Sequence, residues 1–367
     1  MRHLESALSA ASQALGVSDP NPRVGCLVAG GGGYVLAVGH TQAAGSAHAE
    51  IMALRAARAA GHDVRGATAY VTLEPCSHHG RTPPCCDALI EAGVAKVVVA
   101  IEDPNPLVAG RGIARLRAAG IDVEVVGGEW GAASRELNIG FFSRMKRGRP
   151  WVRMKIAASL DGRTALDGGV SQWITGDAAR ADGHAWRRCA GAVLTGIGTV
   201  KEDDPRLDVR LVDTTVQPLR VVVDSRLEIA PGARILQPPG RALVYTALDD
   251  DRRCAALASD HVEVARLPGD ASGKTDLAAL LADLARREVN ELHVEAGEKL
   301  NGSLLRAGLV DELLVYMAPR LLGPGRGMAA IGPLASLAET LDFEFVEVTQ
   351  VGADLRLRLR PPGRADF

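Results

Sequence analysis

The chain has 367 residues, a length that suits two domains, each large enough to bury a core of its own. Its 42 Lys and Arg residues balance 44 Asp and Glu residues, and only 4% of the chain is aromatic, which argues against a nucleic-acid partner. No apolar run approaches the roughly eighteen residues of a membrane span, and we expect a small-molecule partner, no nucleic acid and no membrane.

The first 145 residues alternate predicted helices and strands. The N-terminal segment has apolar residues at helical spacing, at Leu4, Leu8, Ala11 and Leu15. It lacks the continuous apolar core of a signal peptide, which predicts a cytoplasmic protein. The further elements expected are a hairpin around four glycines (24–40), a helix (49–61), a strand (66–75), a helix (83–93), a strand (94–106), a helix (110–120) and a strand (121–128). This order predicts a mostly parallel sheet with a hairpin at one side.

A basic segment, 135–150, ends at Gly148 and Pro150, and a fresh strand pattern follows it. We place the domain boundary there, giving domains 1–146 and 147–367. The second half predicts strands at 151–159, 192–200, 219–225, 242–246, 262–267, 291–297 and 312–319, helices at 276–287 and 299–308, and a closing hairpin at 343–361. This pattern predicts a second α/β domain with its own sheet.

Three residues in the first half form a candidate metal site. Imidazole plus two thiolates is a known ligand set for catalytic zinc, which keeps its fourth position for water. His48, Cys76 and Cys85 supply such a set, and the prolines at 83–84 place Cys85 at a helix start, where the helix dipole stabilises a thiolate. Of the six cysteines, three lie within 76–86, and this clustering favours a metal over disulfides.

Glu50 would make this metal site catalytic. Zinc deaminases carry H-x-E followed by P-C-x-x-C, with the glutamate shuttling protons. His48-Ala49-Glu50 matches the first part and Pro75-Cys76 begins the second, but eight residues separate Cys76 from Cys85 instead of two. A purely structural zinc would need a fourth ligand, for which Cys86, His78 and His79 are candidates; we expect Cys86 in the core.

The motifs together resemble a known family. The segments NPRVG (21–25), HAE (48–50), EPCSHHGRTPPC (74–85), EDPNP (102–106), MKIAASLDGRTA (154–165) and SQWIT (171–175) are similar to those of the bifunctional riboflavin-biosynthesis deaminase/reductase family, and the likeness runs nearly end to end. It implies a cytidine-deaminase-like three-layer domain followed by a dihydrofolate-reductase-like α/β domain. The implied cofactors are Zn²⁺ and NADPH. We also expect a homo-oligomer, although no motif specifies the oligomeric state.

The resemblance also implies the reaction. The first domain would hydrolyse the 2-amino group of 2,5-diamino-6-(5-phosphoribosylamino)pyrimidin-4-one, a phosphorylated pyrimidine, and the second would reduce its ribosyl group to ribityl with NADPH. Asn21 is similar to a base-recognising asparagine and Asn105 to a further substrate contact. The chain departs from the family at Thr41, where a histidine is frequent, and at Ala47, where a proline is frequent, which puts the substrate grip of this loop in doubt.

For the second domain no G-x-G-x-x-G follows a strand, so a Rossmann site is not supported. Small residues at the helix start after strand 291–297 suit phosphate binding through backbone N–H groups, although a plain strand-to-helix turn has the same pattern. The resemblance assigns Ala157, Trp173, Thr199, Asp203, Ser225 and Gly297 to the cofactor. It assigns Lys155, Ser171, Arg187, Leu207, Arg210 and Glu295 to the substrate, with Arg210 on the phosphate.

Two other functions remain open from the residues. The second half could bind a nucleotide without reducing anything. The whole chain could instead be a zinc-stabilised scaffold or nucleic-acid module, in which case Glu50 would be dispensable.

Overall fold

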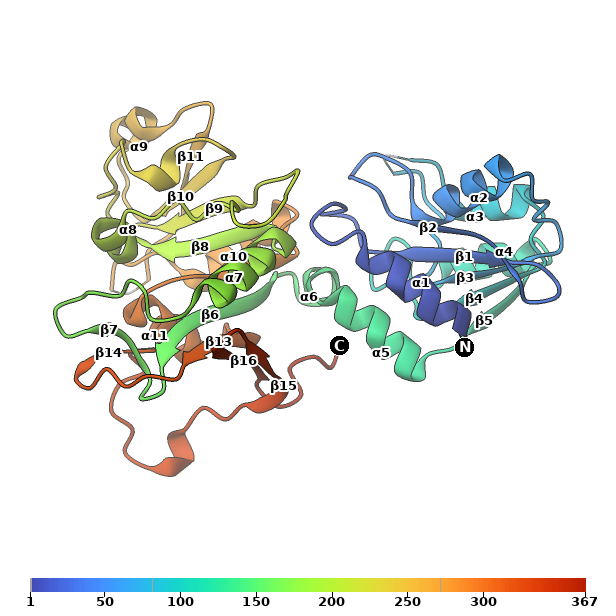
Figure 1. Cartoon of the computed structure of the whole chain (residues 1–367). Coiled ribbons are helices and arrows are strands. Elements are labelled where there is room, and N and C mark those ends of the chain that lie inside the picture. The colour runs from blue at the N-terminus through green and yellow to red at the C-terminus, as the bar shows by residue number, and fades with distance from the viewer. Residues whose placement is uncertain (1, 81, 271) are drawn as a thin grey trace. The chain divides into compact units, whose positions relative to one another are not determined.

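The computed structural model describes residues 2–80, 82–270 and 272–367; Met1 of the predicted first helix and Arg81 of the cysteine motif lie outside them. The chain forms two compact units (Figure 1). One runs from the N-terminus to Gly148 and includes Phe367, and the other is Arg149–Asp366.

The first unit contains a five-stranded sheet in the order β2-β1-β3-β4-β5. Strand β1 pairs antiparallel with β2 and with β3, whereas β3, β4 and β5 are parallel. This arrangement confirms the expected hairpin beside a parallel sheet. The strands are β1 (Gly25–Ala29), β2 (Val35–His40), β3 (Thr68–Val71), β4 (Lys96–Val99) and β5 (Asp122–Val125).

Helices cover both faces of this sheet, which makes three layers. Alternate residues of β4 show why: Val97 and Val99 pack into the core beneath α2, α3 and α4, whereas Val98 packs with Leu4 of α1 and Trp130 of α5. The helices are α1 (Arg2–Ser12), α2 (Ala49–Ala59), α3 (Cys85–Glu91), α4 (Arg111–Ala118), α5 (Gly128–Leu137) and α6 (Ile139–Arg147). The last helix occupies the basic segment that precedes the boundary.

The second unit contains a nine-stranded sheet in the order β11-β10-β9-β8-β12-β6-β13-β16-β15. All neighbours from β11 to β13 are parallel, and the closing hairpin adds β16 and β15 antiparallel. The strands are β6 (Trp151–Ser159), β8 (Ala192–Gly196), β9 (Leu219–Val223), β10 (Ala242–Thr246), β11 (Val262–Arg266), β12 (Glu291–Val294), β13 (Glu312–Ala318), β15 (Glu344–Val351) and β16 (Asp354–Arg360). A separate two-stranded sheet pairs β7 (Arg163–Leu166) with β14 (Gly325–Gly327).

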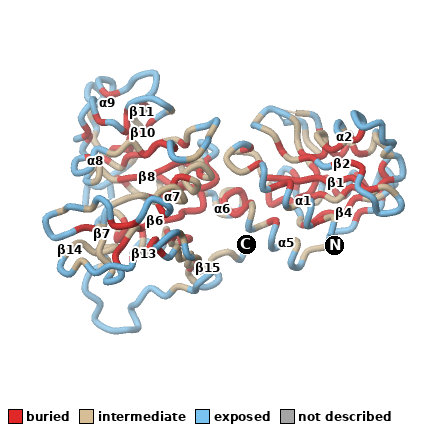
Figure 2. The backbone as a smooth tube through the Cα atoms, in the orientation of Figure 1, coloured by how far each residue is buried: buried red, intermediate tan, exposed pale blue. Residues whose placement is uncertain are grey.

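The large sheet also has helices on both faces. Leu194 of β8 packs into the core that includes Leu280 and Leu304, from α10 and α11, whereas Val193 packs with Val200 and Leu257, from α8 and α9. The helices are α7 (Asp177–Cys189), α8 (Ile197–Asp203), α9 (Asp251–Leu257), α10 (Leu277–Arg286) and α11 (Glu298–Arg306), with short 3-10 turns η1 (Arg234–Leu236) and η2 (Leu337–Glu339). Figure 2 shows the central strands of each sheet as the most deeply buried part of its unit.

One expected strand was wrong in its extent. The segment 192–200 is a strand only to Gly196, and Ile197 begins α8. Glycines at 196 and 198 end the extended run, and the chain turns into a helix at the carboxyl edge of the sheet. Among the described residues, no helix combines the length and apolar character needed to cross a membrane.

Candidate active sites

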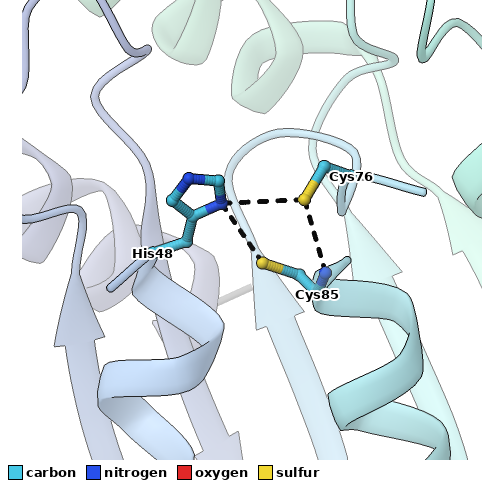
Figure 3. Close-up of side chains that lie close together, drawn as sticks. All are labelled: His48, Cys76 and Cys85. Atoms are coloured by element: carbon cyan, nitrogen blue, oxygen red, sulfur yellow. Dashed lines mark hydrogen bonds between the residues drawn. The ribbon is translucent and has the colours of Figure 1, made fainter. Parts of the chain in front are cut away.

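The candidate zinc ligands converge in the first unit (Figure 3). One ligand atom from each of His48, Cys76 and Cys85 lies within 4.8 Å of the others. Nδ1 of His48 is 3.6 Å from Sγ of Cys76 and 3.3 Å from Sγ of Cys85. A nitrogen and two sulfurs at mutual contact distance form a donor set that fits a tetrahedral zinc ion with one position left for water.

Local structure explains the convergence. His48 is the N-cap of α2, Cys85 is the first residue of α3, and Cys76 lies in the loop after β3. The backbone N–H of Cys85 donates to Sγ of Cys76 at 3.3 Å. Hydrogen bonds from the Cys85 thiol, from His48 and from this N–H lower the pKa of Cys76. The two helix starts therefore surround the sulfurs with N–H groups that favour a thiolate.

Glu50 lies in the first turn of α2, two residues after His48, and only 3% of it is exposed. Burial raises the pKa of its carboxyl to about 7, and the nearby Cys76 adds to the rise. A carboxyl with a pKa near neutrality can both accept and release a proton, which is what a proton shuttle requires.

Sequence reasoning missed Glu74, a buried carboxylate directly before the Pro75-Cys76 segment. Its two oxygens accept hydrogen bonds from four backbone N–H groups, at Asp103 (3.2 Å), Gly110 (2.9 Å), Gly112 (2.8 Å) and Ile113 (3.2 Å). This one side chain joins the metal-ligand loop to the loop after β4 and to the start of α4. The signal available in the sequence was its place as an acidic residue at the end of a buried strand.

The alternative metal ligands lie apart from the cluster. The only three-residue metal-ligand group found among the described residues contains neither Cys86 nor the histidines at 78 and 79. Cys86 is fully buried, as expected, and its Sγ donates to the backbone oxygens of Pro75 and Gly112.

The residues expected to grip the pyrimidine are in loops. The side chain of Asn105 accepts a hydrogen bond from the backbone N–H of Leu107, and Ser18 donates to the backbone oxygen of Asn21. Thr41 is 2% exposed, and its hydroxyl lies within hydrogen-bond distance of both the N–H and the oxygen of Val24. Thr41 is therefore engaged with the protein backbone, at the position where the family frequently has a histidine.

The second unit contains a cavity of about 1540 Å³ at the carboxyl ends of its parallel strands. Open α/β sheets bind ligands at this edge. The walls include all twelve residues that the resemblance assigned to cofactor or substrate in this half, namely Lys155, Ala157, Ser171, Trp173, Arg187, Thr199, Asp203, Leu207, Arg210, Ser225, Glu295 and Gly297. Gly297 is the N-cap of α11, so the backbone N–H groups at that helix start face the cavity edge.

Charged residues form a connected group in this cavity. Arg187 binds Glu295 through two nitrogens, with Nη2 at 2.9 Å from Oε2, and Nζ of Lys155 is 3.6 Å from the same oxygen. These cations hold the pKa of Glu295 well below its usual range despite its burial. Glu295 is therefore a fixed anion in the cavity wall.

His184 is a further cavity residue that sequence reasoning missed, since a histidine within a helix gives no motif. Its Nδ1 accepts the backbone N–H of Arg210 at 3.1 Å, and its Nε2 lies 3.3 Å from Nη1 of Arg187. Burial and the two arginines lower the pKa of His184 to about 4, so its ring is neutral at pH 7. Asp208 completes the group by accepting from Nη1 of Arg210 at 2.6 Å.

Comparison with known proteins places both units. The zinc-binding region of cytidine and deoxycytidylate deaminases matches residues 1–101, and the RibD C-terminal domain matches residues 150–357. Riboflavin biosynthesis protein RibD of Escherichia coli (strain K12) is 45% identical over 370 residues, which cover 97% of this chain and 98% of that protein. The protein of the same description from Aquifex aeolicus (strain VF5) is 39% identical and covers 96% of each chain.

Two solved structures match over almost the whole length. Acinetobacter baumannii RibD is 41% identical with a TM-score of 0.88, and the match covers 98% of each chain. The diaminohydroxyphosphoribosylaminopyrimidine deaminase/5-amino-6-(5-phosphoribosylamino)uracil reductase of Thermotoga maritima is 34% identical with a TM-score of 0.87 and the same coverage.

These matches confirm the fold class, the two activities and the two cofactors expected from the sequence. The first unit is a zinc-binding deaminase domain of the cytidine-deaminase type, and the second is a dihydrofolate-reductase-like domain that uses NADPH. The chain belongs to the RibD family of bifunctional riboflavin biosynthesis deaminase/reductases.

Proposed function

We propose that this chain deaminates the phosphorylated diaminopyrimidine in residues 1–146 and reduces the ribosyl group of the product in residues 147–367. The convergence of His48, Cys76 and Cys85 beside a buried Glu50 supports the first step most strongly. The twelve assigned residues around one cavity support the second.

In the deaminase step, His48, Cys76 and Cys85 would hold the zinc ion. Zinc bound by such a set lowers the pKa of water toward neutrality and so supplies a nucleophile. Glu50 takes a proton from the attacking water and passes protons to the ring nitrogen and to the leaving ammonia. Its raised pKa suits both halves of this transfer, and its burial keeps bulk water from competing. Asn21 and Asn105 bind the pyrimidine and its substituents.

The Glu50→Gln variant tests this step. We expect ammonia release from the diaminopyrimidine substrate to fall by roughly 100- to 10,000-fold, because the amide cannot carry the proton. Zinc content should stay at the wild-type value, because Glu50 is not a ligand. Glu91→Gln, an exposed carboxylate at the end of α3, is the matched control and should retain full activity. Undiminished ammonia release by a zinc-loaded Glu50→Gln protein would show that Glu50 does not carry the proton.

In the reductase step, NADPH would be bound by Ala157, Trp173, Thr199, Asp203, Ser225 and Gly297 and would supply a hydride. The substrate contacts are Lys155, Ser171, Arg187, Leu207, Arg210 and Glu295. Arg210 is about half exposed (47%) and is oriented by Asp208, so its guanidinium is available for the substrate phosphate. Lys155 and Glu295 present a cation and an anion to the opening sugar.

The reductase step is tested by adding NADPH to the purified chain together with the deaminated intermediate. We expect loss of the nicotinamide absorbance and formation of the ribityl product. NADPH binding without any loss of absorbance would instead support a nucleotide-binding domain that does not reduce the intermediate.

We further propose that the protein works in the cytoplasm as a homo-oligomer. The six cysteines are all free, which suits a reducing compartment. Strand β15 lies at the end of the large sheet with Phe345 65% and Val348 58% exposed, and an apolar edge strand is a surface that a second copy can cover. Sedimentation of wild type and Val348→Lys tests this: we expect an oligomer that the lysine dissociates, and a monomeric wild type would contradict the proposal.

A further inference from the structure

His293 is a buried histidine beside the reductase cavity that has no assigned role. It lies on β12, with β8 on one side and β6 on the other. Its side chain is fully buried, and among the described residues neither ring nitrogen has a well-aligned hydrogen-bond partner. Burying an imidazole without well-aligned hydrogen-bond partners destabilises the folded state. The contacts that His293 does make therefore need an explanation.

The nearest charged group is Glu295, two residues along and therefore on the same side of the sheet. Nε2 of His293 lies 3.5 Å from Oε1 of Glu295, which is the long limit of a hydrogen bond. Burial and the nearby Arg153 and Arg187 lower the pKa of His293, which keeps the ring neutral. A neutral imidazole has one N–H, and because a carboxylate only accepts, that hydrogen belongs on Nε2.

The four donors around Glu295 divide between its two oxygens. Oε1 accepts a hydrogen bond from Nε of Arg187 and faces Nε2 of His293. Oε2 accepts a hydrogen bond from Nη2 of Arg187 at 2.9 Å and faces Nζ of Lys155 at 3.6 Å. Two oxygens offer about four acceptor positions, so all of them are assigned.

The side chains that make these four contacts differ in their exposure to solvent. Side-chain exposure is 0% for His293 and 11% for Arg187 but 23% for Lys155. Lys155 is the most exposed of these partners, so we infer that a substrate hydroxyl that binds Glu295 takes the place of Lys155 at Oε2.

We propose that His293 is a positioning residue of the reductase site, which holds Oε1 of Glu295 so that Oε2 faces Lys155 and the substrate. His293 touches neither substrate nor cofactor and acts only through the carboxylate. This inference rests on the proposed role of Glu295 as a substrate contact.

The His293→Met and His293→Gln variants of the full chain test the proposal. The two new side chains have similar length and volume, but only the glutamine amide can donate to Oε1. With the deaminated intermediate and NADPH, we expect His293→Met to lose about tenfold in kcat/KM, since a hydrogen bond to a charged group is worth that much. His293→Gln should recover most of that loss. Ammonia release by the same preparations and their thermal unfolding show whether the chains are folded.

The Glu295→Gln background separates the two proposals and also keeps the test informative if the methionine destabilises the unit. In that background His293→Met should cause little further loss, because its effect passes through the carboxylate. Equal losses for His293→Met and His293→Gln, or a full further loss in the Glu295→Gln background, would show that His293 only fills space. If Glu295→Gln itself reduces the intermediate at the wild-type rate, the substrate role of Glu295 fails instead.

Discussion

Oγ1 of Thr82 lies 3.4 Å from Nε2 of His48, while Nδ1 of the same ring faces the two cysteine sulfurs. When Nδ1 binds a metal, Nε2 carries the ring hydrogen, and a hydroxyl at this distance accepts it. Such outer contacts orient a ligand histidine and raise its basicity.

We predict that Thr82→Val lowers zinc affinity by roughly 10- to 100-fold, because the methyl that replaces the hydroxyl cannot accept from Nε2. Thr82→Ser retains the oxygen and should keep affinity close to wild type. Competition with a chromophoric chelator measures both. Equal affinities for the valine and serine variants would show that the ring is oriented by packing alone.

Gly112 has no room for a side chain. A Cβ atom there would lie 2.0 Å from the backbone oxygen of Pro75 and 3.1 Å from Oε1 of Glu74. We predict that Gly112→Ala displaces the loop before Cys76, which lowers both the unfolding temperature of the deaminase unit and its zinc content. Gly31→Ala, where a Cβ would meet nothing within 4 Å, is the control. A zinc-replete, fully stable Gly112→Ala protein would mean that the loop can shift freely.

The two-pronged contact of Arg187 with Glu295 depends on the guanidinium shape. Lysine keeps the charge but cannot make two parallel hydrogen bonds. We predict that Arg187→Lys lowers kcat/KM for the reductase step by roughly 10- to 100-fold, the equivalent of one charged hydrogen bond. Arg188→Lys, one position along α7, should behave as wild type, and NADPH consumption measures both. Wild-type kcat/KM in Arg187→Lys would rule out a role for the fork geometry.

We predict that the second unit loses stability in acid because of Glu312. It is fully buried and contacts Arg153 at 2.6 Å, Arg358 at 3.0 Å and Arg360 at 2.7 Å, which holds its pKa below the usual range. Because the folded pKa is depressed, the carboxylate adds stability above its unfolded pKa of about 4.3, and this is lost as pH falls toward the folded pKa. Urea unfolding should therefore show a steep fall in the free energy of unfolding below pH about 4.

The Glu312→Gln variant isolates this contribution. At neutral pH we expect it to lose roughly 3–5 kcal/mol, because buried arginines lose their counter-charge. Its stability should also fall less steeply with acid than that of wild type. Glu344→Gln, on an exposed position of β15, should follow the wild-type curve. A parallel acid profile for Glu312→Gln and wild type would assign the acid sensitivity to other carboxylates.

The sequence was most informative where a residue pattern has a direct geometric meaning. Parallel strands separated by helices require crossovers, and this places successive strand ends on one edge of a sheet, as β3 and β4 show. The metal site could be predicted because His48 and Cys85 each stand at a recognisable helix start. The residues that line the reductase cavity were predicted from the family resemblance, since no phosphate-binding fingerprint marks them in the sequence.

Other features had no sequence signal. The strand 192–200 was extended too far because Ile197 and Val200 suit a strand as well as the helix that they form. His184 contacts Arg210, which is 26 residues away in the chain, and only the folded sheet brings Arg187 near Glu295. The four backbone N–H groups that meet Glu74 belong to loops whose path no periodicity describes.

The four backbone hydrogen bonds to Glu74 determine which part of the loop after β4 can be changed to alter the substrate preference of the deaminase. Glu74 fixes the chain at Asp103 and again at Gly110, and between these points Pro104 and Val108 are buried, whereas Pro106 and Leu107 are exposed. Residues 105–107 can therefore be exchanged as a cassette to screen altered pyrimidine preference, while the buried Pro104 and Val108 and the anchored ends isolate the cysteine loop from the change.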